Sequence, residues 1–186
     1  MLNSQVLSQT SQVRPWVKSS LLVVGASLLI GLSAHIKIPL PFTPIPISMQ
    51  SFTVLFLATF LGSKRGSLAV LAYLMEGILG FPVFSGGNAG LAYFMGVTGG
   101  YLVGFVFAAF ATGWIIERTK KSLSSAFIAW VVGDLIIYAC GLAWLSQFVG
   151  GMKAAFLLGM LPFLIGSSAK LLLALSGIKT IRAFKT

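Results

Sequence analysis

Three ionisable side chains interrupt the long apolar stretches of this 186-residue chain: Glu76, Asp134 and Lys170. A charge near the centre of a bilayer costs about 2.5–3.5 kcal/mol on insertion scales, so such residues normally pair with one another or face a cavity. One interpretation is an internal ion pair of Lys170 with Asp134 or Glu76. The other, which the sequence favours, is that Lys170 meets an anionic ligand, because a lysine ammonium is a compact charge that suits a carboxylate.

Little else in the chain has the chemistry of an active site. The chain has a single histidine, His35, so at most one Ser/His/Asp set is possible. No Cys/His cluster has metal-ligand spacing. The basic run at residues 62–67 (GSKRGS) lacks the G-x-x-x-x-G-K-[ST] pattern of a phosphate-binding loop. We therefore expect a protein that is not an enzyme and that has no metal site and no cofactor.

Composition indicates an all-α integral membrane protein. Hydrophobic residues make up 57% of the chain and charged residues 9%, and the mean hydropathy is +0.97. The net charge of +10 does not indicate nucleic acid, because the basic residues lie at the ends of apolar runs rather than on one face. We expect one membrane domain over residues 1–186, with a polar cytoplasmic tail at 1–15 and a helical bundle at 16–183.

Six candidate spans follow from the apolar runs, since a helix needs about 20 residues to cross the hydrocarbon. They cover residues 16–35, 47–63, 67–81, 99–116, 123–146 and 155–178. The second and third are short and form either two tight crossings or a re-entrant hairpin. The sixth contains Pro162, which predicts that its long helix starts near that residue, after a short interfacial helix.

The distribution of basic residues favours six crossings with both termini in the cytoplasm. With that orientation ten basic residues lie inside and two, Lys37 and Lys153, lie outside. The ten are Arg14, Lys18, Lys64, Arg65, Arg118, Lys120, Lys121, Lys179, Arg182 and Lys185. A re-entrant hairpin would place Lys64 and Arg65 on the outer side, and the count of basic residues would become eight inside against four outside. The larger bias is the one that the positive-inside rule predicts.

Two connections on the outer side are apolar and irregular. Residues 38–48 (IPLPFTPIPIS) carry Pro39, Pro41, Pro44 and Pro46, a spacing that no helix accommodates. Irregular backbone near a bilayer is tolerated where protein or a water-filled site surrounds it, so we expect this strap to cover a cavity. The connection at residues 81–100 is uncharged and rich in glycine, and it is either a plain loop or a second part of the lid.

Rows of small residues at four-residue spacing follow several spans. Ser27 and Gly31 form such a pair in the first span, and Gly96, Gly100, Gly104 and Ala108 form a longer row in the fourth. Small residues let helix backbones approach closely in lipid. The rows indicate either packing within the bundle, which is the commoner use, or a face for another membrane subunit.

Three strings of the chain resemble a known family: IPLPFTPIPISMQSF, LGSKRGSLAVLAYLMEGILGFPVFSGG and GLAYFMGVTGGYLVGF. They resemble the BioY family, the biotin-binding S components of energy-coupling factor (ECF) transporters, and the likeness spans residues 36–173. It implies a six-helix bundle in the cytoplasmic membrane, with a biotin pocket near the outer face closed by the first, third and fifth loops. It also implies a membrane T subunit and two cytoplasmic ATPases as partners, with Ser27 and Gly31 contacting the T subunit.

The resemblance also implies a set of ligand contacts. Asn88 and Gln50 would pair with the ureido ring, and Tyr93 would pack on the ring system. Lys170 would neutralise the carboxylate. The last-helix motif of the family resembles Gly-Asp-x-x-Lys, and here Ser167 stands in place of the aspartate. We include Ser167 as a ligand contact whose hydroxyl can hydrogen-bond without a charge.

Two other functions remain open at this point. A solitary facilitator would transport the vitamin without any ATPase. A membrane-embedded enzyme acting on lipid is disfavoured by the scarcity of catalytic side chains.

Overall fold

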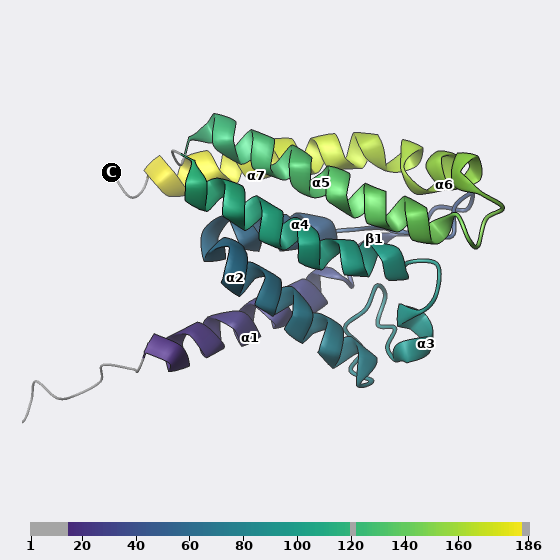
Figure 1. The fold of residues 1–186 in the computed structure, drawn as a ribbon, viewed down its shortest axis with the longest axis horizontal. Coiled ribbons are helices and arrows are strands. Elements are labelled where there is room, and N and C mark those ends of the chain that lie inside the picture. Colours follow the sequence, from purple (N-terminus) through teal and green to yellow (C-terminus); the bar gives the residue numbers. More distant parts are fainter. Residues whose placement is uncertain (1–14, 120–121, 184–186) are drawn as a thin grey trace, which may run out of the picture.

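A computed structural model describes residues 15–119 and 122–183 of the chain, which are mostly helical (Figure 1). The expected tail up to residue 14 lies outside the described residues, as do Lys120, Lys121 and Lys185. The helices are α1 (Pro15–Ser33), α2 (Gln50–Ile78), α3 (Leu91–Phe94), α4 (Gly99–Arg118), α5 (Leu123–Leu145), α6 (Met152–Gly159) and α7 (Leu164–Ala183). Five helical stretches of the described residues are long and apolar enough to cross a membrane, so this is a multi-pass membrane protein.

The longest helical stretch, α2, is a hairpin. Its continuity is broken at Gly62, whose backbone angles (φ 80°, ψ 179°) are not helical. Gly66 packs directly on Ala58, since a Cβ at Gly66 would lie 3.1 Å from the Ala58 Cα. The Gln50 amide donates a hydrogen bond to the Tyr73 hydroxyl, although a straight helix would hold the two residues ~35 Å apart. α2 therefore consists of two antiparallel arms that reverse at Gly62.

The turn between the arms is clamped by the end of α4. The Glu117 carboxylate accepts hydrogen bonds from the Ser63 main-chain N–H (2.9 Å) and the Ser63 hydroxyl (2.7 Å). A Cβ at Gly62 would lie 2.0 Å from the Glu117 Oε1, so glycine provides both the positive φ and the space. The sequence-based boundaries, which left residues 64–66 between two spans, are wrong here because the reversal needs a single residue.

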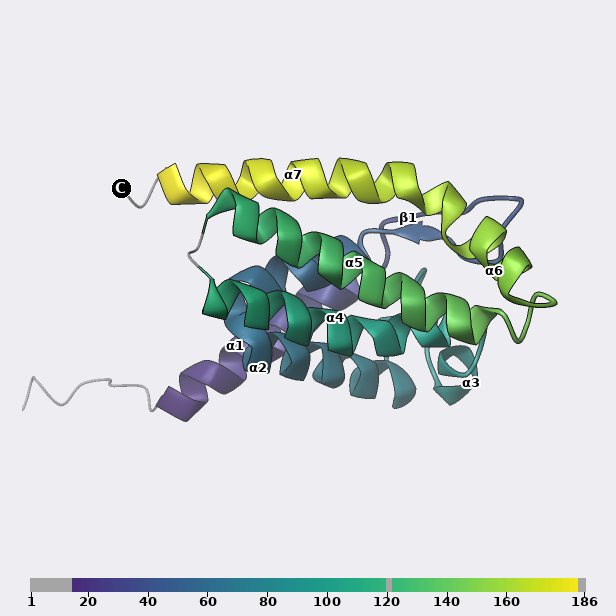
Figure 2. The ribbon, with the colours of Figure 1, turned by 45° about the horizontal axis from the view of Figure 1, so that its top comes forward.

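α4 is the central helix of the bundle and packs mainly on α2 and α5. Figures 1 and 2 show α1 and α7 on opposite sides of this group. A Cβ at Gly100 would lie 2.2 Å from the Trp144 Cβ, and one at Gly104 would lie 3.1 Å from the Ile137 Cα. The glycine row of α4 is thus used for packing within the bundle, the commoner of the two uses considered for it.

The small residues of α1 also pack within the chain. Ser27 is 0% exposed, and its hydroxyl donates to the Glu76 Oε1 at 2.8 Å. A Cβ at Gly31 would lie 3.1 Å from the Val83 side chain. The second arm of α2 and its following loop cover Ser27 and Gly31 in this structure, and the contact of these two residues with a T subunit stays a prediction. The uncovered side of α1 is lined by leucines such as Leu21 and Leu28.

The proline strap is non-helical, as its sequence predicts, but it has more structure than expected. Strand β1 (Lys37–Ile38) pairs antiparallel with β2 (Ile47–Ser48) at its two ends. The Thr43 hydroxyl, at the tip, donates to the Leu158 carbonyl of α6 at 2.7 Å. A short 3-10 turn, η2 (Leu161–Phe163), separates α6 from α7, which confirms the break expected at Pro162.

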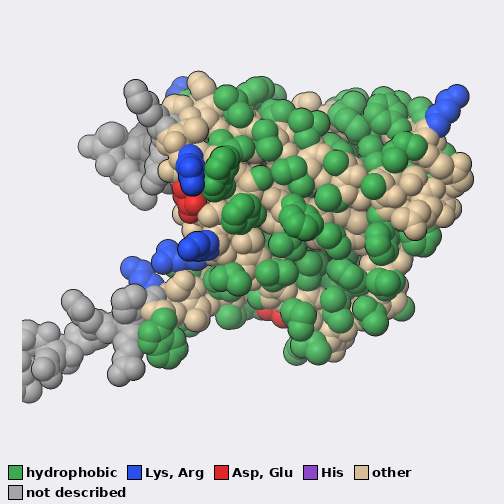
Figure 3. Space-filling model, viewed as in Figure 1, with side chains coloured by type: hydrophobic (Ala, Val, Ile, Leu, Met, Phe, Trp, Pro, Cys, Tyr) green, Lys and Arg blue, Asp and Glu red, His purple; other side chains and the backbone are tan. Residues whose placement is uncertain are grey.

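The surface has the pattern of a membrane protein. Apolar side chains cover the middle of the visible face, and the Lys and Arg side chains gather mainly at the end where α1 begins (Figure 3). Large hydrophobic residues exposed along the helices include Leu32, Phe107 and Ile165. Such a band suits a lipid environment.

Candidate functional site

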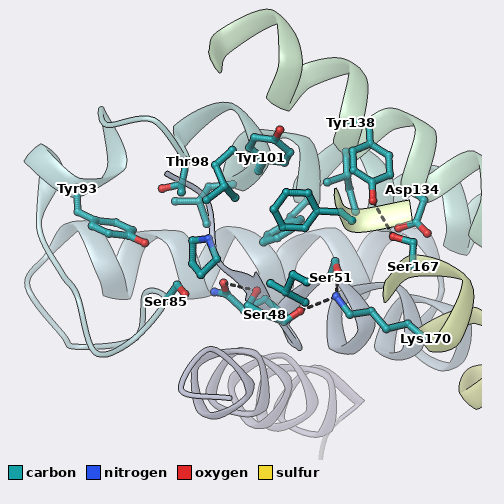
Figure 4. A pocket seen from close by; sticks show the side chains of 18 residues that line it. Ser48, Ser51, Ser85, Tyr93, Thr98, Tyr101, Asp134, Tyr138, Ser167 and Lys170 are labelled. Atoms are coloured by element: carbon teal, nitrogen blue, oxygen red, sulfur yellow. Dashed lines mark hydrogen bonds between the residues drawn. The ribbon is translucent and has the colours of Figure 1, made fainter. Parts of the chain in front are cut away.

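A cavity that is partly open to solvent lies between the end of the strap, the first arm of α2, and helices α4, α5 and α7 (Figure 4). Its apolar walls include Leu102, Phe105, Ile137 and Phe163. The polar residues that line it are Ser48, Gln50, Ser51, Ser85, Tyr93, Thr98, Tyr101, Asp134, Tyr138, Ser167 and Lys170. Mostly apolar walls with a few placed polar groups are typical of small-molecule sites.

One end of this cavity carries the charged groups, Asp134 on α5 and Lys170 on α7 (Figure 4). The Lys170 ammonium donates to the Ser48 carbonyl at 2.6 Å and to the Ser51 hydroxyl at 3.0 Å. The Ser167 and Tyr138 hydroxyls share a hydrogen bond of 2.7 Å. Four elements of the fold thus converge on this end of the cavity, which we call the inner end.

Gln50 lines the cavity wall, but its amide is already engaged. It is 3% exposed, donates to Tyr73 and accepts a hydrogen bond from the Ser48 hydroxyl at 3.2 Å. The network orders the junction between the strap and both arms of α2. Gln50 therefore supports the wall as well as offering polar atoms to a ligand.

Asn88 lines a neighbouring outer cavity, together with strap residues and Lys37. Its amide donates to the Ser85 carbonyl at 2.6 Å. Tyr93 lines both cavities and stacks on Phe84, with ring centroids 5.4 Å apart. Of the five predicted ligand contacts, the structure brings Gln50, Tyr93, Ser167 and Lys170 to the cavity beside α7 and Asn88 to the adjoining one.

Ser85 is a site residue that the sequence did not single out. It is 7% exposed, it lines both cavities, and its hydroxyl has no hydrogen-bond partner among the described residues. Buried hydroxyls are normally paired, so an unpaired one at the junction of two cavities indicates a ligand contact. The one feature of the sequence that could have pointed to Ser85 is its position in the apolar connection at 81–100, which was considered as a second part of the lid.

The acids expected in the spans have different surroundings. Glu76 bonds Ser27 away from the cavity, whereas Asp134 lines it. Within residues 15–119 and 122–183, neither forms an ion pair closer than 4 Å with Lys170, so the internal ion pair considered from the sequence is wrong in that form. The described residues also contain no group of three or more His, Cys, Asp or Glu that could hold a metal ion.

A statistical model of the BioY family matches residues 4–186, almost the whole chain. This chain belongs to the BioY family. The biotin transporter BioY of Rhizobium etli is 37% identical over 158 residues, covering 80% of this chain and 84% of the relative. The biotin transporter BioY of Thermotoga maritima is 35% identical over 162 residues, covering 87% and 89%.

A solved structure agrees with this assignment. The 2.1 Å crystal structure of the S-component for biotin from an ECF-type ABC transporter superposes with a TM-score of 0.81 and 25% sequence identity. The match covers 98% of this chain and 95% of the other. BioY membership makes the chain a transport protein and not an enzyme, which removes the lipid-modifying alternative.

Proposed function

We propose that this protein binds biotin from outside the cell and serves as the substrate-binding S component of an ECF transporter. The observation that carries the proposal is the cavity between the strap and helices α4, α5 and α7, which joins apolar walls to charged and hydroxyl groups. Relatives named as biotin transporters and the biotin S-component structure support the choice of ligand.

The chemistry of biotin matches the cavity. Biotin has a neutral ureido ring with two N–H donors and a carbonyl, an apolar thioether ring and an anionic tail. Tyr93 and the apolar walls suit the ring system, and Lys170 and Ser167 offer donors to ligand oxygens. Asn88 and Lys37 of the outer cavity extend the polar surface beneath the strap.

We further propose six crossings of the cytoplasmic membrane by one domain, with both termini inside. The hairpin form of α2 supports this, since each of its arms is a separate antiparallel helix and the turn carries Lys64 and Arg65. Lys37 and Lys153 then lie at the opposite end. The strap is extracytoplasmic in this orientation and forms the lid of the site.

The proposed partners are a membrane T subunit and two cytoplasmic ATPases, because the chain has no phosphate-binding loop of its own. A solitary facilitator is the second candidate. Biotin uptake by cells that express this protein and lack any T subunit separates the two. Accumulation that occurs only when a T subunit and the ATPases are supplied supports the S component.

The direct test is isothermal titration of the detergent-purified protein with biotin. We expect saturable binding at micromolar ligand or below. Absence of heat together with absence of competition against labelled biotin would refute the proposal.

A further inference from the structure

Of the three acidic residues of this chain, Asp134 is the one that lines the cavity. Glu117 caps the turn of α2 through Ser63. Glu76 accepts a hydrogen bond from Ser27 through one carboxylate oxygen, and its other oxygen is buried away from the cavity without a hydrogen-bond partner among the described residues. No hydrogen bond to the Asp134 carboxylate is present among residues 15–119 and 122–183. An acid in an apolar helix is costly, so a carboxylate that lines a cavity and has no hydrogen bond within the described residues indicates a ligand.

The groups around Asp134 narrow down what it recognises. Lys170 lies at the same end of the cavity and interacts electrostatically with Asp134. One negative and one positive charge make this end nearly neutral. An anionic tail placed here would be repelled by Asp134 while it is attracted to Lys170, whereas a neutral group with both donors and acceptors suits both side chains.

The ureido ring of biotin is such a group. Its edge presents N–H, C=O and N–H in a row, which is a donor, an acceptor and a donor. The inner end supplies the complement: the Asp134 carboxylate is an acceptor, Lys170 is a donor, and the Tyr138 and Ser167 hydroxyls can be either. A hydrogen bond to a carboxylate is about twice as strong as a neutral one.

We propose that Asp134 accepts a hydrogen bond from a ureido N–H of biotin and is the residue by which this site recognises the ring. The inference rests on the proposed function, since it assumes that biotin is the ligand. It assigns the charged acceptor to α5, at the same end of the cavity as Ser167 of α7, which stands where the family motif has an acid (Figure 4).

The first experiment compares Asp134→Asn with Glu76→Gln by titration with biotin. Both changes replace an acid in a span by its amide, but Glu76 lies outside the cavity. We expect Asp134→Asn to weaken biotin at least ten-fold and Glu76→Gln to change the affinity less than two-fold. A wild-type protein that binds no biotin defeats the proposed function, whereas biotin binding by Asp134→Asn within two-fold of wild type overturns the role of Asp134 alone.

Rescue provides a second, independent readout. Because Ser167 lines the same end of the cavity, an acid placed there can take over the acceptor role. The double variant Asp134→Asn with Ser167→Asp is expected to recover at least five-fold of the lost affinity. Recovery is not expected if Asp134 only stabilises the fold, so a double variant no better than Asp134→Asn contradicts the proposal.

The ligand side is tested without any change to Asp134. Biotins methylated on one or the other ureido nitrogen are titrated into the wild type, and one of them should bind at least ten-fold more weakly than biotin. That same analogue should lose little further affinity in Asp134→Asn, because the partner of its missing N–H is already gone. Equal affinity of wild type for biotin and both analogues would overturn the proposal even if Asp134→Asn failed to fold.

Discussion

The Lys170 ammonium lies 2.6 Å from the main-chain oxygen of Ser48, a residue 122 positions earlier in the chain. This hydrogen bond joins the first half of α7, the last membrane helix, to the point where the strap enters α2. A lysine ammonium has three donors, and Ser48 and Ser51 use two of them. The third is available to a ligand, so Lys170 is able to hold the strap and the ligand at once.

Replacing Lys170 by methionine tests both roles. We expect faster amide hydrogen exchange in residues 45–49 of the ligand-free protein and biotin binding weakened about ten-fold, since a charged hydrogen bond contributes about 1.5 kcal/mol or more. With Asp134 at the same end, the loss should be equal for biotin and biotin amide. A clearly larger loss for the acid would instead place the carboxylate at Lys170, which is the expectation from the sequence.

Removing the Ser85 hydroxyl should weaken binding without destabilising the protein. The hydroxyl has no hydrogen-bond partner in the part of the chain that the structure describes, so Ser85→Ala removes no hydrogen bond there. We expect an unchanged unfolding temperature and about five-fold weaker binding, the equivalent of about 1 kcal/mol. Ser146→Ala is the matched control, because that hydroxyl bonds the carbonyl of Ala143 in its own helix. Affinity retained in Ser85→Ala would show that the ligand does not reach the hydroxyl.

The strap tip should control the rate of ligand release. Thr43→Val keeps the shape of the side chain but removes two hydrogen bonds, one to the Leu158 carbonyl (2.7 Å) and one from the Ile45 main-chain N–H (3.3 Å). Only the first of them joins the strap tip to α6. We expect the dissociation rate of biotin, measured by chase with unlabelled ligand, to rise about five-fold, in line with about 1 kcal/mol for one hydrogen bond. The control is Thr180→Val, whose hydroxyl bonds its own helix at Ser176. Identical release from both variants would mean that the strap tip does not hold the lid closed.

The turn of α2 should be sensitive to a single methyl group. Gly62 and Gly150 have nearly the same φ, 80° and 83°, but a Cβ at Gly150 meets nothing within 4 Å. Both alanine variants suffer the backbone strain, and Gly62→Ala additionally displaces the Glu117 carboxylate from Ser63. We expect Gly62→Ala to unfold at least about 3 °C below Gly150→Ala in a thermal melt. In a Glu117→Gln background that gap should shrink, and a gap of the same size would locate the strain elsewhere.

The sequence predicted the features that depend on local patterns. Apolar length gave the spans, Pro162 gave the break before α7, and the proline spacing gave a non-helical strap. Lys170 and Ser167 were assigned to the site and lie in the cavity. Each of these depends on residue types within a short window, which is where propensity and charge are informative.

The features that the sequence missed depend on contacts between distant segments. From the sequence, a glycine that ends a helix cannot be distinguished from one at which the chain reverses. The contact between Gly62 and Glu117 makes the distinction, and it is visible only in the fold. The small-residue pair of α1 suits packing inside the chain or against a partner, and the hydrogen bond from Ser27 to Glu76 shows that Ser27 packs inside the chain. Nothing in the sequence distinguishes Ser85 from the other serines, because its role depends on its position between two cavities.

Of the long helical stretches that the structure describes, the last one has the smallest share of buried residues. Only 6% of the most apolar stretch spanning α6 and α7 is buried inside the chain, against 61% for α4. Yet α7 carries both Ser167 and Lys170. Under the proposed function, biotin bound between α7 and its neighbours adds contacts to this helix. The biotin-bound protein should then resist proteolysis along α7, and unfolding, more than the ligand-free protein.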